Sequence, residues 1–251
     1  MRLSTHCVLA LLLLLSVLPF RRLEAQDSLD DSLISDAAYR YAILQYHQAV
    51  SPEVGLYRGP QYIDYTHTIQ KGQPFFGPDS LRRGTVWYGG IGYDGVSMEY
   101  DLVKDQLAIA DFRSSFRIAL LMEFVDSFRL DDQQFIKIRD SVAPDFIRGG
   151  YCDRLYGGTR FALLKRDRKF IHENLMVTPD NVRLFIDESI AYYWFENGKY
   201  HPVNTKAQLL AVLKDRQQDA RRVIRKSKSG WRRDKEPLLL AVAQWYNGVN
   251  H

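Results

Sequence analysis

The sequence has only two cysteines, Cys7 and Cys152, among its 251 residues. Cys7 falls in an N-terminal segment that we expect to be removed, which leaves a single thiol and excludes an internal disulfide. Burial of side chains must therefore stabilise the fold. An aromatic content of 13% agrees with this expectation, because aromatic side chains bury a large apolar area per residue.

The sequence also lacks an apolar run long enough to cross a bilayer as a helix, which requires about 20 residues. A shorter run at residues 7–18 follows Arg2 and precedes the stretch 23–25 with its small residue. This order is typical of a secretory signal peptide. We therefore expect residues 1–25 to be a signal peptide. The mature chain from Gln26 is expected to be exported and soluble, in the periplasm or associated with the outer envelope.

The frequent catalytic and cofactor-binding motifs are missing too. The histidines have no H-x-x-x-H or H-E-x-x-H spacing, and neither G-x-S-x-G nor a P-loop occurs. The sequence therefore predicts no metal site, no cofactor and no catalytic residue. Residues 90–95 match the dinucleotide pattern G-x-G-x-x-G, but that pattern needs a following helix, and residues 96–101 alternate as a strand. We interpret these glycines as turn and bulge positions.

What the sequence does contain is a succession of short alternating segments from residue 84 to residue 138, which predicts an antiparallel β-meander. Alternation is clearest at residues 96–102, where Glu99 and Asp101 lie on the face opposite to the apolar side chains. Antiparallel sheets often have one dry and one wet face. We therefore expect these two carboxylates on a solvated strand face.

Two hairpins are predicted after the meander. Residues 149–156 and 159–165 are joined by two glycines, and the charged run 166–169 marks the exit of this hairpin. Further on, Asn197 and Gly198 precede residues 200–203, and Asn-Gly favours a type I′ turn because both of its positions require a positive φ. Pro202 places the last strand at a sheet edge.

Helical spacing occurs at both ends of the mature chain. Apolar residues recur every three or four positions at 29–50, and again in about three segments between residues 204 and 251. The predicted fold class is α+β, with a curved antiparallel sheet and an N-terminal helix in a domain at 26–203. A basic helical appendage at 204–251 is expected to pack on this domain.

An apolar sheet face that is incompletely covered could hold a hydrophobic small molecule. The residues of the first two strands that could line such a site are aromatic: Trp87, Tyr88, Tyr93 and Tyr100.

Two observations leave an enzymatic alternative open, a hydrolase or transferase. Glu99 and Asp101 share one strand face and could act as an acid–base pair. Cys152 could act as a nucleophile if a histidine lay near it, although a lone thiol more often packs as a small hydrophobic group.

Charge is unevenly distributed along the chain. The net charge is +4, yet residues 206–236 contain eleven basic and four acidic side chains, and residues 26–205 have a net charge of −5. The basic tail could dock on an anionic membrane or an envelope partner, and a solvated helix face explains it as well. Nucleic acid is not expected for an exported protein. The candidate residues are Arg221, Arg222, Arg225, Lys226, Trp231, Arg232 and Arg233.

Several short segments carry a resemblance when they are taken in order. They are LYRG at 56–59, PFF at 74–76, GTVWYGG at 84–90, MEYDL at 98–102, VDSF at 125–128, GYCD at 150–153 and NGKYHPV at 197–203. With the leader and the basic tail, the chain resembles a group of exported proteins of Bacteroidota for which no activity is established. The resemblance implies location and kinship of fold, and it implies no functional residue. The expected function is a non-catalytic periplasmic or envelope protein that binds a hydrophobic molecule or an envelope partner.

Overall fold

The computed structural model describes Ala38 and residues 55–111, 114–138, 144, 147, 149–158, 160–174, 183–227, 229–231 and 234–248. The signal peptide at 1–25 and nearly all of the helix predicted at 29–50 lie outside the described residues. The chain divides into two compact units, residues 1–41 and 42–251. All elements below belong to the second unit.

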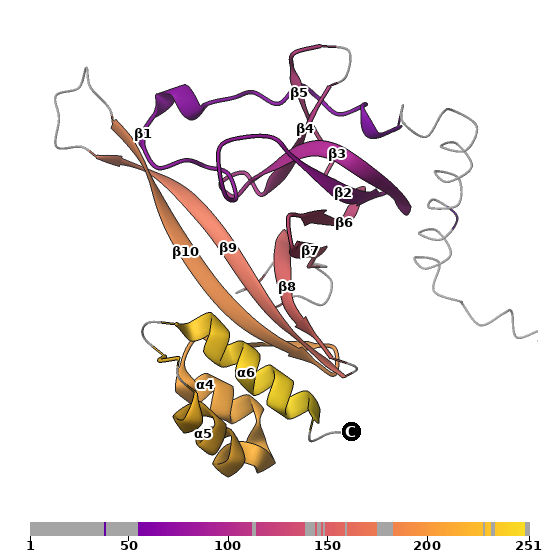
Figure 1. The fold of residues 1–251 in the computed structure, drawn as a ribbon. Helices are drawn as coiled ribbons and strands as arrows, with labels where there is room; N and C mark the ends of the chain where they lie inside the picture. The colour runs from indigo at the N-terminus through magenta and orange to yellow at the C-terminus, as the bar shows by residue number, and fades with distance from the viewer. Residues whose placement is uncertain are drawn as a thin grey trace, which may run out of the picture. The chain divides into compact units, whose positions relative to one another are not determined.

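The second unit contains a single sheet of eleven strands, in the order β1-β10-β9-β8-β7-β6-β2-β3-β4-β5, with β11 beside β10. Figure 1 shows that the sheet is curved, most clearly along β9 and β10. The strands are β1 (Ile69–Lys71), β2 (Arg82–Tyr88), β3 (Ile91–Asp101), β4 (Gln106–Ala110), β5 (Arg117–Ala119), β6 (Val125–Leu130), β7 (Gln133–Lys137), β8 (Tyr151–Gly157), β9 (Phe161–Asn174), β10 (Arg183–Glu196) and β11 (Lys199–Pro202).

The predicted α+β class, with a curved sheet and C-terminal helices, is confirmed. Two features differ from a plain meander. β6 returns to pair with β2, so that β2 lies between β3 and β6. β1 pairs with β10 in parallel, whereas the other strand pairs of this sheet are antiparallel.

The glycine-rich segment at 90–95 is part of the β2–β3 hairpin. Gly89 and Gly90 form its turn with φ of 58° and 80°. Gly84 pairs with Val96 while Val86 pairs with Tyr93, so one residue of β2 opposes two of β3. This is a bulge, and Gly95 in it has a φ of 69°. The interpretation as turn and bulge positions is confirmed for Gly90 and Gly95, whereas Gly92 is a regular strand residue paired with Trp87.

The prediction that residues 166–169 form the exit of a hairpin is wrong. β9 continues through them to Asn174 and pairs with β10 over its whole length. All four residues are charged, and the run therefore has no apolar period that would mark a strand in the sequence. The later hairpin agrees with its prediction: Asn197 and Gly198 have φ of 52° and 72°, and β11 pairs only with β10.

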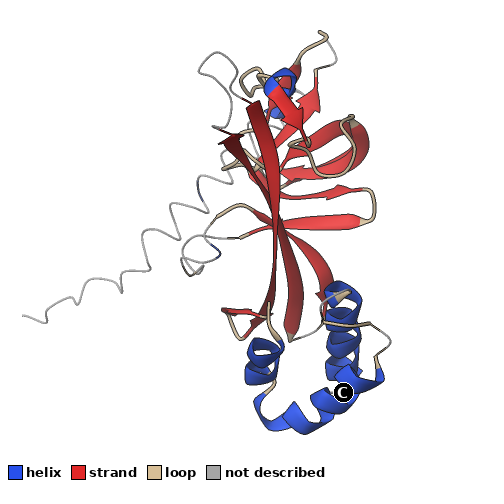
Figure 2. Cartoon of the chain, turned by 90° about the vertical axis from the view of Figure 1, so that its left-hand side faces the viewer, coloured by secondary structure: helices blue, strands red, loops and turns tan. Residues whose placement is uncertain are grey.

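Three α-helices follow the sheet: α4 (Lys206–Val212), α5 (Gln217–Lys226) and α6 (Lys235–Gly248), with a 3₁₀ turn η4 at Lys214–Arg216. Thr205 and Gln208 form a capping box at the start of α4, which satisfies backbone groups that the first helical turn leaves free. Figure 2 shows the helices gathered at one end of the sheet. No helix in the described part of the chain is long and apolar enough to cross a membrane.

Two large cores stabilise this unit. One lies on the strands from β2 to β8 and is rich in aromatic rings, with Phe128 and Phe135 stacked at a centroid distance of 4.7 Å. The other lies between the strands β9 and β10 and the helices, where Phe161 and Trp194 stack at 4.2 Å and pack with Leu239 of α6. The helices therefore share a core with the sheet.

Candidate functional site

The four aromatic residues predicted to line a hydrophobic site occupy three different environments. Tyr88 and Tyr100 are buried within the core on β2–β8, with 3% and 1% of their surface exposed, and Tyr93 packs against that core. The ring centroid of Trp87 lies 5.9 Å from the guanidinium carbon of Arg129. None of the four lines the three cavities described below.

The prediction that Glu99 and Asp101 lie on a solvated strand face is wrong, because both are fully buried. The segment before β2 covers this end of β3. Asp101 Oδ2 accepts hydrogen bonds from the hydroxyls of Tyr62 at 2.7 Å and Tyr65 at 2.8 Å. Its Oδ1 accepts two backbone N–H bonds, one of them from Val103 at 2.8 Å. Asp101 therefore holds the covering segment on the sheet.

Only one of the two carboxylate oxygens of Glu99 has a hydrogen-bond partner. Its Oε1 accepts a bond from Arg117 at 2.6 Å, while Oε2 is buried and has no hydrogen-bond partner. Burial raises the pKa of Glu99 to about 7, and the Arg117 guanidinium opposes this rise. Because the carboxyl has no exposed surface, its raised pKa bears on stability and not on the binding of a ligand.

Cys152 is a buried thiol in a small core with Leu164 and Tyr193. Burial raises its pKa to about 12. The nucleophile is the thiolate, and almost none forms at neutral pH with such a pKa.

A cluster of charged side chains lies where β8, β9 and β10 meet the start of α6. Asp153, Lys165 and Tyr192 form a row across the three strands, since Lys165 is the register partner of both others. Asp167 lies two residues further along β9 and therefore on the same face. Glu236 enters from the first turn of α6.

The ammonium of Lys165 is the centre of this cluster. Its Nζ lies 3.4 Å from Asp167 Oδ2 and 3.1 Å from Glu236 Oε2. Glu236 Oε2 also accepts a bond from the hydroxyl of Tyr192 at 3.3 Å. Two carboxylates thus pair with one ammonium, Asp153 neighbours it on β8, and Asp167 Oδ1 is buried without a hydrogen-bond partner.

The electrostatics of the cluster disfavour further negative charge. Burial raises the pKa of Asp153 to about 6; Lys165 opposes this, and Asp167 and Glu236 add to it. Burial likewise raises the pKa of Asp167. Carboxyl groups with raised pKa beside a cavity mark a candidate binding or catalytic site.

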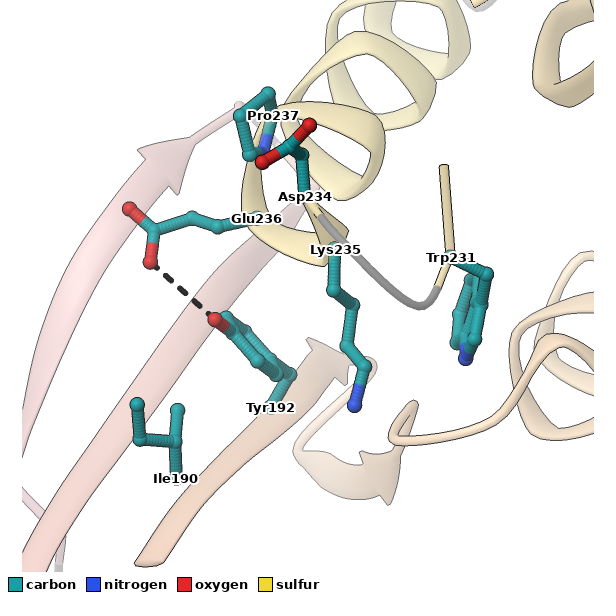
Figure 3. Close-up of a pocket in the computed structure, with 7 residues that line it drawn as sticks. All are labelled: Ile190, Tyr192, Trp231, Asp234, Lys235, Glu236 and Pro237. Atoms are coloured by element: carbon teal, nitrogen blue, oxygen red, sulfur yellow. Dashed lines mark hydrogen bonds between the residues drawn. The ribbon is translucent and has the colours of Figure 1, made fainter. Parts of the chain in front are cut away.

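Two cavities adjoin the cluster and share Ile190 of β10 in their walls. The first, of about 610 Å³, lies between β10 and the residues around the start of α6 (Figure 3). The second, of about 210 Å³, contains Lys165 and Asp167 in its wall. The first is lined by Ile190, Tyr192, Trp231, Asp234, Lys235, Glu236 and Pro237.

An ammonium group already lies between the aromatic walls of the first cavity. Lys235 Nζ is 5.6 Å from the ring centroid of Tyr192 and 5.9 Å from that of Trp231. Figure 3 shows the Lys235 side chain reaching between these two rings, with Glu236 directed to the other side of Tyr192. Aromatic faces attract cations at such distances. The arrangement is suited to a positively charged group.

A larger hollow of about 770 Å³ lies at the β10–β11 hairpin beside α4. Its carboxylate, Glu196, already accepts bonds from the Tyr246 hydroxyl at 3.2 Å and the Trp194 indole at 3.4 Å. The cavity at α6 is the stronger candidate, because its aromatic rings flank an ammonium group. No group of three or more potential metal ligands occurs among the residues that the structure describes.

The residues predicted to face an anionic partner differ in where they lie. The four on α5 are exposed, and Arg222 pairs with Asp219 at 3.1 Å. Trp231 is in the wall of the first cavity. Arg232 and Arg233 lie outside the described residues. The residues on α5 are Arg221, Arg222, Arg225 and Lys226.

No protein-family model matches the chain, and no curated protein or solved structure matches it significantly. The resemblance to exported proteins of Bacteroidota therefore stays a prediction. The sequence did not single out Lys165, Asp167, Tyr192 or Glu236, because they come together only through strand register and the docking of α6. A signal existed in the charges of residues 165–169, which are unusual inside a hairpin strand.

Proposed function

We propose that this protein is a non-catalytic, exported binding protein of the cell envelope whose ligand carries an ammonium group. The observation that carries the proposal is the cavity at α6, in which Tyr192 and Trp231 flank the ammonium of Lys235. A ligand ammonium would take the place of Lys235 between the rings, with the carboxylate of Glu236 on the far side of Tyr192. The burial of Glu99 and Cys152 weighs against the enzymatic alternative.

The charge of the cluster around Lys165 supports a cationic ligand. Asp153, Asp167 and Glu236 carry three negative charges when ionised, against the single positive charge of Lys165. Carboxylates in such surroundings are stabilised by an additional cation. Asp167 Oδ1, which has no hydrogen-bond partner, is an acceptor that a ligand N–H could use.

Lys235 competes with a ligand ammonium for the same aromatic walls. We expect Lys235→Met, which keeps the apolar stem and removes the charge, to bind 1,5-diaminopentane about two- to fivefold more tightly than the unchanged protein. Trp231→Leu is expected to weaken binding. Isothermal titration calorimetry measures both.

Lys206→Met is the matched control, since Lys206 is exposed on α4 and lies outside all three cavities. It is expected to bind the diamine as the unchanged protein does. Equal affinity of Lys235→Met and Lys206→Met would contradict the competition between Lys235 and the ligand, and undetectable diamine binding by Lys235→Met would count against the site itself.

The location in the envelope rests on the leader-like residues 1–25. Sequencing the N-terminus of protein recovered from a periplasmic fraction tests it, and we expect the chain to begin near Gln26. Protein that keeps residues 1–25 and stays in the cytoplasmic fraction would contradict export.

A second candidate function is docking on an anionic membrane surface. It is favoured by the exposure of four basic side chains on α5, since each basic residue near such a surface adds about 1 kcal/mol of attraction. We expect Arg221→Gln/Arg225→Gln to reduce co-sedimentation with vesicles containing an anionic lipid, and binding of the unchanged protein to fall as salt rises. Binding that is insensitive to salt would argue against this function.

A further inference from the structure

The outer edge of β10 is paired at both ends, and between them it is open as far as the described residues go. At one end β1 pairs with Leu184 and Phe185. At the other end β11 pairs with residues 193–196. Gly72 lies against Ile186, and no described strand pairs with the edge from there to Ala191. In Figure 1 this edge runs between β1 and the helices.

The register shows which backbone groups point outward from this edge. Tyr192 donates its N–H to Asn204 Oδ1 at 2.7 Å, and its carbonyl accepts a bond from the Val203 N–H at 2.9 Å. Tyr192 therefore directs its backbone away from β9. Because backbone direction alternates along a strand, Ile190 and Glu188 direct their N–H and C=O groups outward as well.

The same two residues place the open edge beside the candidate site. Ile190 opposes Asp167 and Glu188 opposes Lys169 across the β9–β10 pair, so their side chains share the face that carries Lys165. Ile190 is 50% exposed and belongs to the walls of both adjoining cavities. A strand added at this edge would direct every second side chain toward those cavities.

We propose that the ligand of this site is an extended polypeptide segment, which adds to the open edge of β10 as a strand. Its backbone bonds to Ile190 and Glu188, and a lysine or arginine side chain enters the cavity beside Tyr192 and Trp231. This inference rests on the proposed function, because it assigns the ammonium or guanidinium to a peptide side chain.

Three observations favour a basic polypeptide as the occupant. An exposed, unpaired strand edge is a template for strand addition, and this one already accepts β1 in parallel and β11 in antiparallel orientation at its two ends. Asp187 and Glu188 lie along it with side chains 71% and 63% exposed, and each has one partner within the chain, His172 at 2.9 Å and Lys169 at 3.2 Å respectively. The adjoining cavity holds an ammonium between aromatic rings.

The test uses a capped heptapeptide of alternating valine and lysine, its glutamate counterpart, and 1,5-diaminopentane, titrated into the full mature chain. The lysine peptide is expected to bind at least about tenfold more tightly than the diamine, because backbone bonds are added, and the glutamate peptide is expected not to bind. Ile190→Pro removes one outward N–H without breaking the pairing to β9. Relative to Ile190→Ala, which removes the same side chain from the cavity walls, it is expected to weaken peptide binding several-fold.

Variation of the peptide provides a readout that does not depend on how the variants fold. Two versions of the lysine peptide are compared, one N-methylated at its lysines and the other at its valines. They are expected to differ about tenfold in affinity, because only one edge of the peptide faces β10 and methylation removes the N–H groups of a single edge in each version. Equal affinity of the two, or of Ile190→Pro and Ile190→Ala, would overturn the inference. The inference would also be overturned if sedimentation equilibrium showed that the protein is a dimer and that the lysine peptide does not dissociate this dimer. Diamine binding without peptide binding overturns this inference alone, whereas absence of both overturns the proposed function too.

Discussion

At the scale of single residues, Glu99 makes the stability of the protein depend on pH. Its folded-state pKa of about 7 exceeds the ordinary value of 4.5 because the carboxyl is buried. The folded state therefore binds more protons than the unfolded state between these values, and the free energy of unfolding falls as pH rises through this window, by at most about 1.4 kcal/mol per pH unit. We expect Glu99→Gln to remove this part of the slope in urea unfolding series between pH 4.5 and pH 7.5.

Asp153 provides a comparison for this experiment. Its pKa is raised in the same direction, to about 6, so Asp153→Asn is expected to reduce the slope below pH 6, where Glu99 also contributes, and to leave the slope above pH 6 unchanged. If Glu99→Gln kept the full slope of the unchanged protein between pH 6 and pH 7, the assignment to Glu99 would be wrong.

At the scale of elements, the β10–β11 hairpin depends on a turn that requires positive φ. Gly198 has a φ of 72°, and a Cβ added there would meet no atom within 4 Å. Gly198→Ala is therefore expected to cost about 1 kcal/mol of unfolding free energy through backbone strain alone. Gly230→Ala is the matched control, because Gly230 has equally open surroundings and no positive φ. Equal unfolding free energies for the two variants would contradict this account of the turn.

Local chemistry explains which elements could be predicted from the sequence. The Asn197–Gly198 turn, the edge strand with Pro202 and the start of α4 at Thr205 all depend on residues close together in the chain. The long β9 could not be predicted, because its charged residues find partners only in the fold: Lys169, for example, donates to the carbonyls of Gln73 and Phe75 at 2.9 and 2.8 Å. The burial of Asp101 depends in the same way on Tyr62 and Tyr65, which lie 39 and 36 residues earlier in the chain.

At the scale of the molecule, the candidate site is assembled from parts that the sequence analysis treated separately. Asp153 and Lys165 belong to the predicted sheet domain, and Trp231 and Glu236 to the predicted helical appendage. The fold class and the basic tail could be predicted, since both follow from periodicity and composition. The site could not, because it exists only where α6 packs on β9 and β10 and the two parts share one core.

Lys235 lowers the affinity of the protein for small amines. A side chain tethered beside its own binding place competes at an effective concentration on the order of millimolar. Small free amines bind more weakly because of this competition, since they offer little beyond the charge that Lys235 already supplies. A molecule that adds contacts outside the aromatic walls displaces Lys235 more readily than a small amine does, so that the lysine favours larger ligands.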